Sequence, residues 1–326
     1  MPFLTVRHTT IYSYKKKVAF GEHRVMFRPR DSYDQRLLHA SLDIEPEPDT
    51  LHWTHDVFGN CVACVRFATR AKTLRFESMI ELDHSSVEEL DFPISPHAQL
   101  YPFAYDQEDV PDLQRSIERA YADPQRELAG WAAAFVRGSA PVRTADLLAR
   151  ITRAISADFT YVRREEMGIQ EPLATLRLRS GSCRDFALLM MEAIRSLGFA
   201  ARFVTGYLFV RGSGSVRLGG GATHAWVQVY LPGAGWREFD PTNGIVGSHD
   251  LIRVGIAREP SHAIPLWGTW MGFPSDSLGL TVEVSVTSAP GQPQDSSQDS
   301  LEDSLQNSPV PAYGRFEPNR ISVTKG

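Results

Sequence analysis

The sequence predicts an α+β protein in which an antiparallel β module comes first and a core of helices and strands follows. Three observations lead to this prediction. The first ~85 residues contain short β-rich runs separated by turn residues, without helical periodicity. From residue 112 onward the spacing of apolar residues becomes helical. After residue 182 a helix with clear start and stop signals is followed by alternating, strand-like segments.

These patterns divide the chain of 326 residues into four parts. We expect an N-terminal β domain at 1–90, a linker at 91–111, a mixed core at 112–287 and a C-terminal tail at 288–326. Four prolines and little periodicity indicate the linker. The tail is rich in Ser, Gln and Asp, and we expect disorder because it has little apolar surface to bury.

Individual elements follow from the same signals. Strands are predicted at 3–6, 38–44, 60–67 and 73–80 of the β module. Helices are predicted at 112–121, at 124–136 and from an N-cap at Thr144 to residue 157. Strands at 200–210, 224–231 and 236–239 follow the capped helix. A strand at 280–286, still within the part assigned to the core, is expected to close the fold.

Composition limits the classes of partner. Apolar side chains make up 42% of the chain, which is typical of a folded protein. A formal net charge of −5 argues against nucleic acid as the main partner. No segment approaches the roughly 18 consecutive apolar residues of a membrane-spanning helix, so we expect no membrane partner. The N-terminus lacks the pattern of a secretory signal and three cysteines form no disulfide framework, so we expect a cytoplasmic protein.

The sharpest boundary in the sequence lies at Ser182. This residue is a good N-cap, Asp185 occupies the capping-box position three residues later, and Gly198 follows the last apolar residue as a helix stop. Cys183 is therefore expected at the first position of a long apolar helix. The positive end of the helix dipole favours a thiolate there, and the free N–H groups can bind an oxyanion on an attacked carbonyl.

A nucleophilic thiolate needs a group that protonates the leaving group. His224 begins an alternating run directly after a glycine-rich loop, which places it at the start of a strand. A turn and a second strand then lead to Asp240. If the two strands form a hairpin, Asp240 lies near His224, where a carboxylate orients the imidazole and stabilises its protonated form.

At this point the sequence resembles a known family. The segments GSCRDFA at 181–187, HAWVQVY at 224–230 and WREFDPTN at 236–243 are similar to those of the bacterial transglutaminase-like superfamily, whose members are often described as cysteine proteases with a papain-like core. The segments YSY at 12–14, GEHRVMFRPR at 21–30 and DVFGN at 56–60 resemble the β domain that precedes this core. The resemblance implies that Cys183 is the nucleophile, His224 the general acid and base, and Asp240 its orienting partner. It also implies that the helix of Cys183 packs on an antiparallel sheet formed by the strands that follow it.

The chemistry that follows is attack of the thiolate on an amide carbonyl and formation of a thioester. With water as acceptor the protein is a protease or amidase acting on a peptide or protein substrate, and this is the function we favour. With an amine as acceptor it is a transglutaminase, and without turnover it is a peptide-binding scaffold. Tyr161 is a candidate side-chain donor to the oxyanion, although an ordinary buried aromatic residue is the simpler interpretation. The sequence does not indicate the oligomeric state.

We expect no cofactor and no metal site. Cys61, Cys64, His52 and His55 are of the types that bind zinc. However, the two cysteines lie in a predicted strand, where positions i and i+3 point to opposite faces of the sheet. The sequence therefore favours small buried thiols at Cys61 and Cys64.

Overall fold

The computed structural model describes residues 3–85, 92–138, 140–163, 168–209, 218 and 221–288. Apart from Ser288, the predicted disordered tail at 288–326 lies outside the described residues. Within these ranges, none of the helices has both the length and the apolar character needed to cross a membrane.

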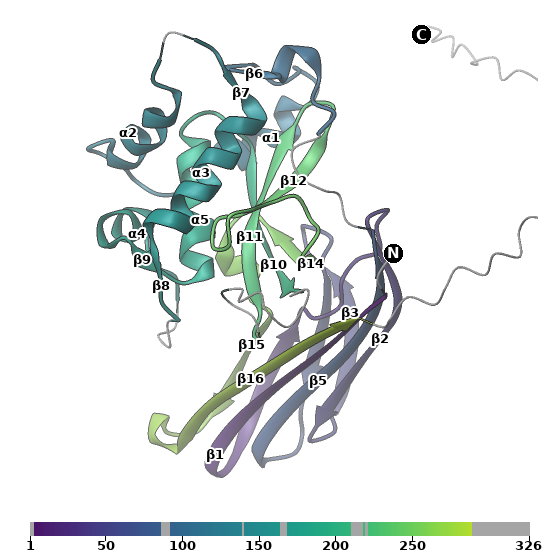
Figure 1. Cartoon of the computed structure of the whole chain (residues 1–326). Coiled ribbons are helices and arrows are strands. Elements are labelled where there is room, and N and C mark those ends of the chain that lie inside the picture. Colours follow the sequence, from purple (N-terminus) through teal and green to yellow (C-terminus); the bar gives the residue numbers. More distant parts are fainter. Residues whose placement is uncertain are drawn as a thin grey trace, which may run out of the picture. The chain divides into compact units, whose positions relative to one another are not determined.

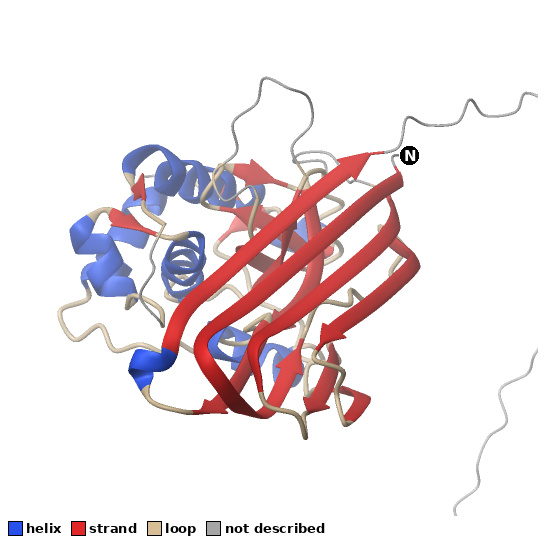
Figure 2. Ribbon diagram, turned by 90° about the horizontal axis from the view of Figure 1, so that it is seen from below, coloured by secondary structure: helices blue, strands red, loops and turns tan. Residues whose placement is uncertain are grey.

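The N-terminal module is built around one long strand, β1 (Phe3–Val25). Its first part pairs on one side with β5 (Ala71–His84) and on the other with β16 (Ser277–Ser288). Its second part pairs with β4 (Cys61–Arg66) and β15 (Leu266–Met271). β2 (Gln35–Glu45) extends the sheet beside β5, and β3 (Thr50–His55) extends it beside β4. All these pairs are antiparallel, and Figure 2 shows the long strands side by side.

The module therefore includes two strands from late in the sequence, β15 and β16, which corrects one expectation. The strand predicted at 280–286 does not close the core, because β16 pairs with β1 from Leu4↔Ser288 to Tyr14↔Ser277. Without β16, one edge of the 3–14 segment of β1 would lack a partner. The local sequence does not indicate which distant strand pairs with that edge. A second late strand, β15, was not predicted and also pairs with β1.

The core contains a five-stranded antiparallel sheet in the order β13-β12-β11-β10-β14. Its strands are β10 (Ala201–Leu208), β11 (His224–Leu231), β12 (Gly235–Asp240), β13 (Ile245–Val246) and β14 (Leu251–Ala257). The helices α3 (Thr144–Asp158) and α5 (Cys183–Arg195) pack against this sheet (Figure 1). Fully buried Leu147 and Leu189 from these helices share one apolar cluster with Val227 of the sheet.

The remaining elements are short. They are α1 (Val110–Ile117), α2 (Glu127–Ala133), α4 (Pro172–Leu178), the 3₁₀ turns η1 (Pro96–Ala98), η2 (Ala134–Val136), η3 (Pro260–His262) and η4 (Pro274–Asp276), and the two-residue strand pairs β6 (Leu100–Tyr101) with β7 (Val142–Arg143) and β8 (Thr160–Tyr161) with β9 (Ser180–Gly181). Thr144 lies inside α3 and does not cap it. Its Oγ1 donates to the carbonyl of Ala98 at 2.6 Å.

The segment predicted as a linker is packed against the core over its described residues. The ring of Tyr101 stacks on Phe199 at 5.5 Å, and its hydroxyl donates to the carbonyl of Leu197 at 3.0 Å. Phe92 is buried in the main apolar cluster. The prolines thus mark irregular backbone, but the aromatic side chains between them bury enough surface to hold the segment in place.

The β module also packs directly on the core sheet. Leu4 and Val6 of β1 share a buried cluster with Tyr207 of β10 and Ile252 of β14. His8 crosses the same contact, with its Nδ1 atom 2.8 Å from the Tyr207 hydroxyl. Burial lowers the pKa of His8 to about 4, so this contact is made by a neutral imidazole.

Candidate active site

The helix that carries Cys183 begins as the sequence predicts. Ser182 is the N-cap of α5, and the Asp185 carboxylate accepts hydrogen bonds at 2.8 Å from both the N–H and the hydroxyl of Ser182. At the other end Gly198 has a φ of +91° and Phe199 donates its N–H to the carbonyl of Ile194 at 3.1 Å, which terminates the helix. Cys183 therefore occupies the first helical position, with an exposed fraction of 8%.

A glycine precedes the capped turn for a steric reason. A Cβ atom on Gly181 would lie 2.9 Å from the Cβ of Asp185 and 3.3 Å from the ring of Phe186. Gly181 also forms the parallel bridge of β9 to Tyr161 of β8, and its carbonyl accepts the N–H of Val162 at 2.9 Å. Close backbone packing on both sides thus fixes the position from which Cys183 starts the helix.

The hairpin of β11 and β12 brings His224 and Asp240 together. Nε2 of His224 lies 2.8 Å from Oδ2 of Asp240, and both side chains are fully buried. The carboxylate is held in turn by the N–H of Thr242 at 2.8 Å and by the amide of Asn243 at 2.9 Å. Asp240 therefore accepts three hydrogen bonds, and its orientation toward His224 is fixed by the turn that follows it.

A second glycine makes room beside the histidine. Gly206 of β10 is paired with His224, and a Cβ atom there would lie 2.0 Å from the carbonyl oxygen of Ile252 and 2.7 Å from the ring of Trp226. Trp226 is fully buried and stacks on the His224 ring at a centroid distance of 6.0 Å. Close strand packing at Gly206 thus lets Trp226 support one face of the imidazole.

The charges of this group favour an imidazolium. Burial by itself lowers the pKa of His224, but the charge and hydrogen bond of Asp240, with a further contribution from the neighbouring Cys183, raise that pKa to about 10. Burial raises the pKa of Asp240. The charge of His224 and the three hydrogen bonds that Asp240 accepts outweigh burial, so the pKa of Asp240 is lowered. His224 can therefore hold a proton beside the Asp240 carboxylate.

The two ring nitrogens have different neighbours. Nε2 is occupied by Asp240, which leaves Nδ1 for Cys183. Nδ1 is buried and has no close hydrogen-bond partner in the described part of the chain. Long contacts between nucleophile and base are common before a substrate binds. The structure thus brings the three residues named from the sequence into one group, in which Asp240 bonds to Nε2 of His224 and Cys183 lies near enough for its charge to act on the imidazole.

Tyr161 belongs to the surroundings of this group. It is half-buried, packs against the cluster that contains Cys183 and lies two residues from the nucleophile across the β8–β9 pair. Burial and the nearby charges of Cys183 and Asp240 raise the pKa of Tyr161. The charge of Arg163 opposes this shift, and the resulting pKa is about 12. Its hydroxyl is therefore a protonated donor beside the nucleophile.

Sequence reasoning missed three supporting residues. Arg184 directly follows the nucleophile and is half-buried, and its Nη2 donates to the carbonyl of Pro260 at 2.8 Å. Asn243 and Trp226 contact Asp240 and His224 as described above. Asn243 follows Asp240 within the same turn signal, so its position was a detectable clue. Trp226 follows His224 by two residues on the same strand, so the alternation of that run was also a clue. The partner of Arg184, Pro260, lies 76 residues further along the chain and left no local signal.

The other cysteines lie in the β module. Cys64 is buried, whereas Cys61 is half-buried with its Sγ 3.7 Å from Nε2 of His55. Among the described residues no group of three or more Cys, His, Asp or Glu side chains is arranged to hold a metal ion.

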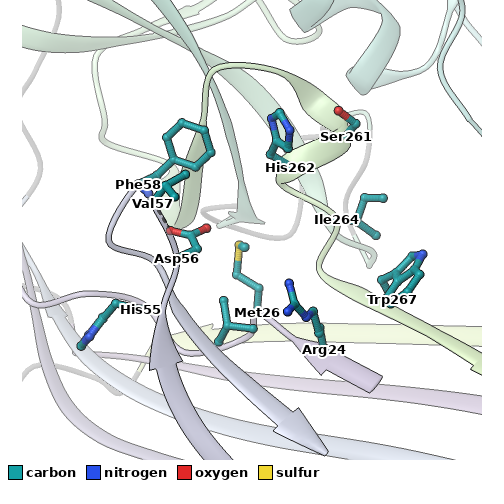
Figure 3. Close-up of a pocket in the computed structure, with 11 residues that line it drawn as sticks. Arg24, Met26, His55, Asp56, Val57, Phe58, Ser261, His262, Ile264 and Trp267 are labelled. Carbon is teal, nitrogen blue, oxygen red and sulfur yellow. Dashed lines mark hydrogen bonds between the residues drawn. The ribbon is translucent and has the colours of Figure 1, made fainter. Parts of the chain in front are cut away.

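A separate cavity of about 560 Å³ lies between the turn after β3 and the segment from η3 to β15 (Figure 3). Its walls are largely apolar and include Met26, Val57, Phe58, Ile264 and Trp267. None of the side chains of Cys183, His224 and Asp240 lines it. The bond from Arg184 to Pro260 connects one wall of this cavity to the helix of Cys183, but the cavity itself is not the place where the three residues meet.

Comparison with known families assigns both parts of the chain. Residues 4–83 match the bacterial transglutaminase-like N-terminal region, and residues 129–241 match the transglutaminase-like superfamily. The chain belongs to the transglutaminase-like superfamily. The second match contains Cys183, His224 and Asp240. An α+β fold with a transglutaminase-like core behind an all-β region is therefore confirmed.

Individual relatives extend over different shares of the chain. An uncharacterized protein of Mycobacterium tuberculosis is 29% identical over 304 residues, which cover 87% of this chain and 92% of that protein. An uncharacterized protein of Mycobacterium leprae is 35% identical over 106 residues, covering 32% of this chain and only 37% of its own length. The crystal structure of a "Putative Cysteine Protease" from Cytophaga hutchinsonii has a TM-score of 0.65 at 19% identity and covers 90% of this chain and 93% of its own, which shows a shared fold.

Proposed function

We propose that the protein hydrolyses an amide bond of a peptide or protein substrate through a thioester formed on Cys183. The observation that carries the proposal is the buried His224–Asp240 pair, bonded at 2.8 Å, beside a cysteine at the first position of a capped helix. This arrangement provides a nucleophile, a proton carrier and an orienting carboxylate in one contiguous group.

The first half of the reaction consumes the amide. The Cys183 thiolate attacks the carbonyl carbon, and the carbonyl oxygen becomes an oxyanion. The N–H of Cys183 lies at a helix position without an intrahelical acceptor and can donate to this oxygen, as can the Tyr161 hydroxyl. The C–N bond then breaks, the leaving amine takes the proton from His224, and a thioester remains on Cys183.

The second half releases the acyl group. Neutral His224 takes a proton from a water molecule, which attacks the thioester carbonyl and restores the oxyanion. The C–S bond breaks, a carboxylic acid leaves, and Cys183 and His224 return to the thiolate–imidazolium pair. Asp240 stays ionised throughout, since its pKa is lowered by His224 and by the turn that holds it.

An amine in place of water gives the second candidate, a protein-glutamine acyltransferase. The match to the transglutaminase-like superfamily supports it, because both reactions pass through the same thioester. A single experiment separates the two. A peptide library is incubated in ¹⁸O-water with and without a primary amine, and the products are weighed by mass spectrometry.

Hydrolysis predicts shorter peptides, or deamidated ones, that carry one ¹⁸O in the new carboxylate whether or not the amine is present. Transfer predicts amine adducts without ¹⁸O at that carbon. Neither product from the wild-type protein, while the Cys183→Ala variant binds the same peptides, would leave only a binding scaffold and would overturn the proposal.

A further inference from the structure

A second pocket lies at the junction of the β module and the core sheet, and it is independent of the proposed hydrolysis. Its volume is about 340 Å³. One wall is the segment 30–34 of the β module and the other is formed by β10, β11, β12 and β14 of the core. We call it the arginine pocket, defined by Arg30, Tyr33, Asp34, Arg202, Trp236 and Arg253. Junctions of this kind are common places for ligand sites.

One of the arginines in this pocket is fully compensated. Nη1 of Arg253 donates to Glu238 at 2.6 Å, and its Nη2 donates to Asp34 at 3.0 Å and to the Ser32 hydroxyl at 3.0 Å. These two carboxylates raise the pKa of Arg253 despite its burial. Arg253 therefore links the two walls of the pocket, and the carboxylates of Glu238 and Asp34 compensate its charge.

Arg202 is different because it lacks an anionic partner. Its guanidinium lies 3.9 Å above the ring of Trp236, and its Nε donates to the neutral amide oxygen of Gln228 at 2.8 Å. In the described part of the chain, neither of its terminal Nη groups has a hydrogen bond or ion pair. Four N–H donors thus remain on the side of Arg202 that lines the pocket.

The surroundings of Arg202 disfavour its charge. Burial and the positive charges of Arg253 and Arg30 lower the pKa of Arg202. The negative charge of Glu238 opposes this shift, and the resulting pKa is about 9. An unpaired, partly buried cation beside two like charges is costly unless an anion joins it. The arrangement therefore suits a ligand that brings one negative charge.

We propose that the arginine pocket binds a carboxylate group, such as that of a peptide, through the terminal N–H groups of Arg202. A guanidinium presents its donors in one plane, which matches the two oxygens of a planar carboxylate. Trp236 covers one face of that plane and can contact the apolar part of the ligand. Asp31 also lines the pocket and disfavours a second negative charge, which selects a monoanion over a dianion such as phosphate.

The test compares two small probes that differ in one group. N-acetylglycine carries a carboxylate, whereas N-acetylglycinamide is neutral and of nearly the same shape. Binding to the wild-type protein is measured by calorimetry at constant ionic strength, with sodium phosphate as a third titrant. We expect N-acetylglycine to bind roughly tenfold or more tightly than the amide, since a hydrogen-bonded charge is worth more than 1.4 kcal/mol. Equal binding of the two probes, or tighter binding of phosphate, would overturn the proposal.

Variants then locate the site. Arg202→Met keeps an apolar chain over Trp236 and removes the donors, so it should abolish the preference for the carboxylate. Arg115→Met is the matched control, since that side chain is 75% exposed on α1, and it should leave the preference intact. An unchanged preference in Arg202→Met would place the carboxylate elsewhere and contradict the inference. The comparison of the two probes on the wild-type protein requires no variant to fold.

Discussion

Nε2 of His224 and Oδ2 of Asp240 lie 2.8 Å apart with both side chains excluded from solvent. The pair lies on adjacent strands of one hairpin, and the turn residues Thr242 and Asn243 donate two more hydrogen bonds to the same carboxylate. Three of the four residues from Asp240 to Asn243 thus fix one imidazole ring. This rigidity has consequences for both the stability and the chemistry of the protein.

The first prediction concerns the pH dependence of stability. The pKa of His224 is higher in the folded protein than its ordinary value of 6.5, so the charged pair stabilises the fold below pH 6.5 and this contribution is lost as the pH rises toward 10. The lowered pKa of Asp240 means that its contribution is present above pH 3.8 and is lost as the pH falls further. Asp240→Asn should therefore flatten the fall in stability between pH 6.5 and 10, as measured by urea unfolding.

Asp146→Asn is the control for this measurement. Asp146 is 51% exposed and lies 4.0 Å from Arg143 on the surface, so its loss should leave the pH profile of the wild-type protein unchanged. Parallel profiles for wild type and Asp240→Asn would show that the pair is not charged in the fold.

The second prediction is that iodoacetamide alkylates Cys183 in preference to Cys61 and Cys64. Exposure alone predicts that Cys61 reacts first, because Cys61 is half-buried whereas Cys183 is 8% exposed. Preference for Cys183 would thus reflect its reactivity beside His224 and the helix dipole. Peptide mapping after partial alkylation measures the three rates, and His224→Asn should slow the reaction at Cys183 alone. Equal rates at all three thiols would refute the prediction.

The third prediction assigns a catalytic contribution to the Tyr161 hydroxyl. If it donates to the oxyanion, Tyr161→Phe should lower kcat by about 100-fold with little change in the rate at which iodoacetamide alkylates Cys183, because alkylation forms no oxyanion. Tyr101→Phe removes a hydroxyl that donates to the Leu197 carbonyl and should leave kcat unchanged. A loss of both kcat and alkylation in Tyr161→Phe would indicate a packing role for this residue.

The fourth prediction tests the strand packing beside His224. Gly206→Ala places a methyl group against the Ile252 carbonyl and the Trp226 ring, and should destabilise the protein by about 1–3 kcal/mol. Gly130→Ala lies in α2 with no heavy atom within 4 Å of the new methyl, so it should stabilise by about 0.5–1 kcal/mol. Thermal unfolding of both variants provides the comparison. A neutral Gly206→Ala would show that the strands can separate at this point.

Local signals explain why much of the core could be predicted. The cap at Ser182, the stop at Gly198 and the alternation from His224 to Leu231 are all encoded within a few residues of the element that they define. The same signals placed Cys183 at a helix start and Asp240 at a strand end. That these residues catalyse a reaction stays a prediction, because their geometry permits the chemistry without demonstrating it.

Pairing across long sequence distances could not be predicted in the same way. β16 joins β1 although about 270 residues separate them, a choice that depends on which strand edge is left open after the β module folds. The sequence predicts a linker at 91–111 because its prolines obscure periodicity, whereas the burial of its described residues depends on Tyr101 meeting Phe199. Arg202 and Trp236 likewise meet only because neighbouring strands bring them together.

The most direct test of the account is the detection of an acyl group on Cys183. The wild-type protein is mixed with its cleaved peptide substrate, quenched in acid and mapped by mass spectrometry. The account predicts a thioester on Cys183 that disappears on treatment with hydroxylamine and is absent from Cys183→Ala. Turnover by the wild-type protein without any such adduct, together with retained turnover by Cys183→Ala, would contradict it.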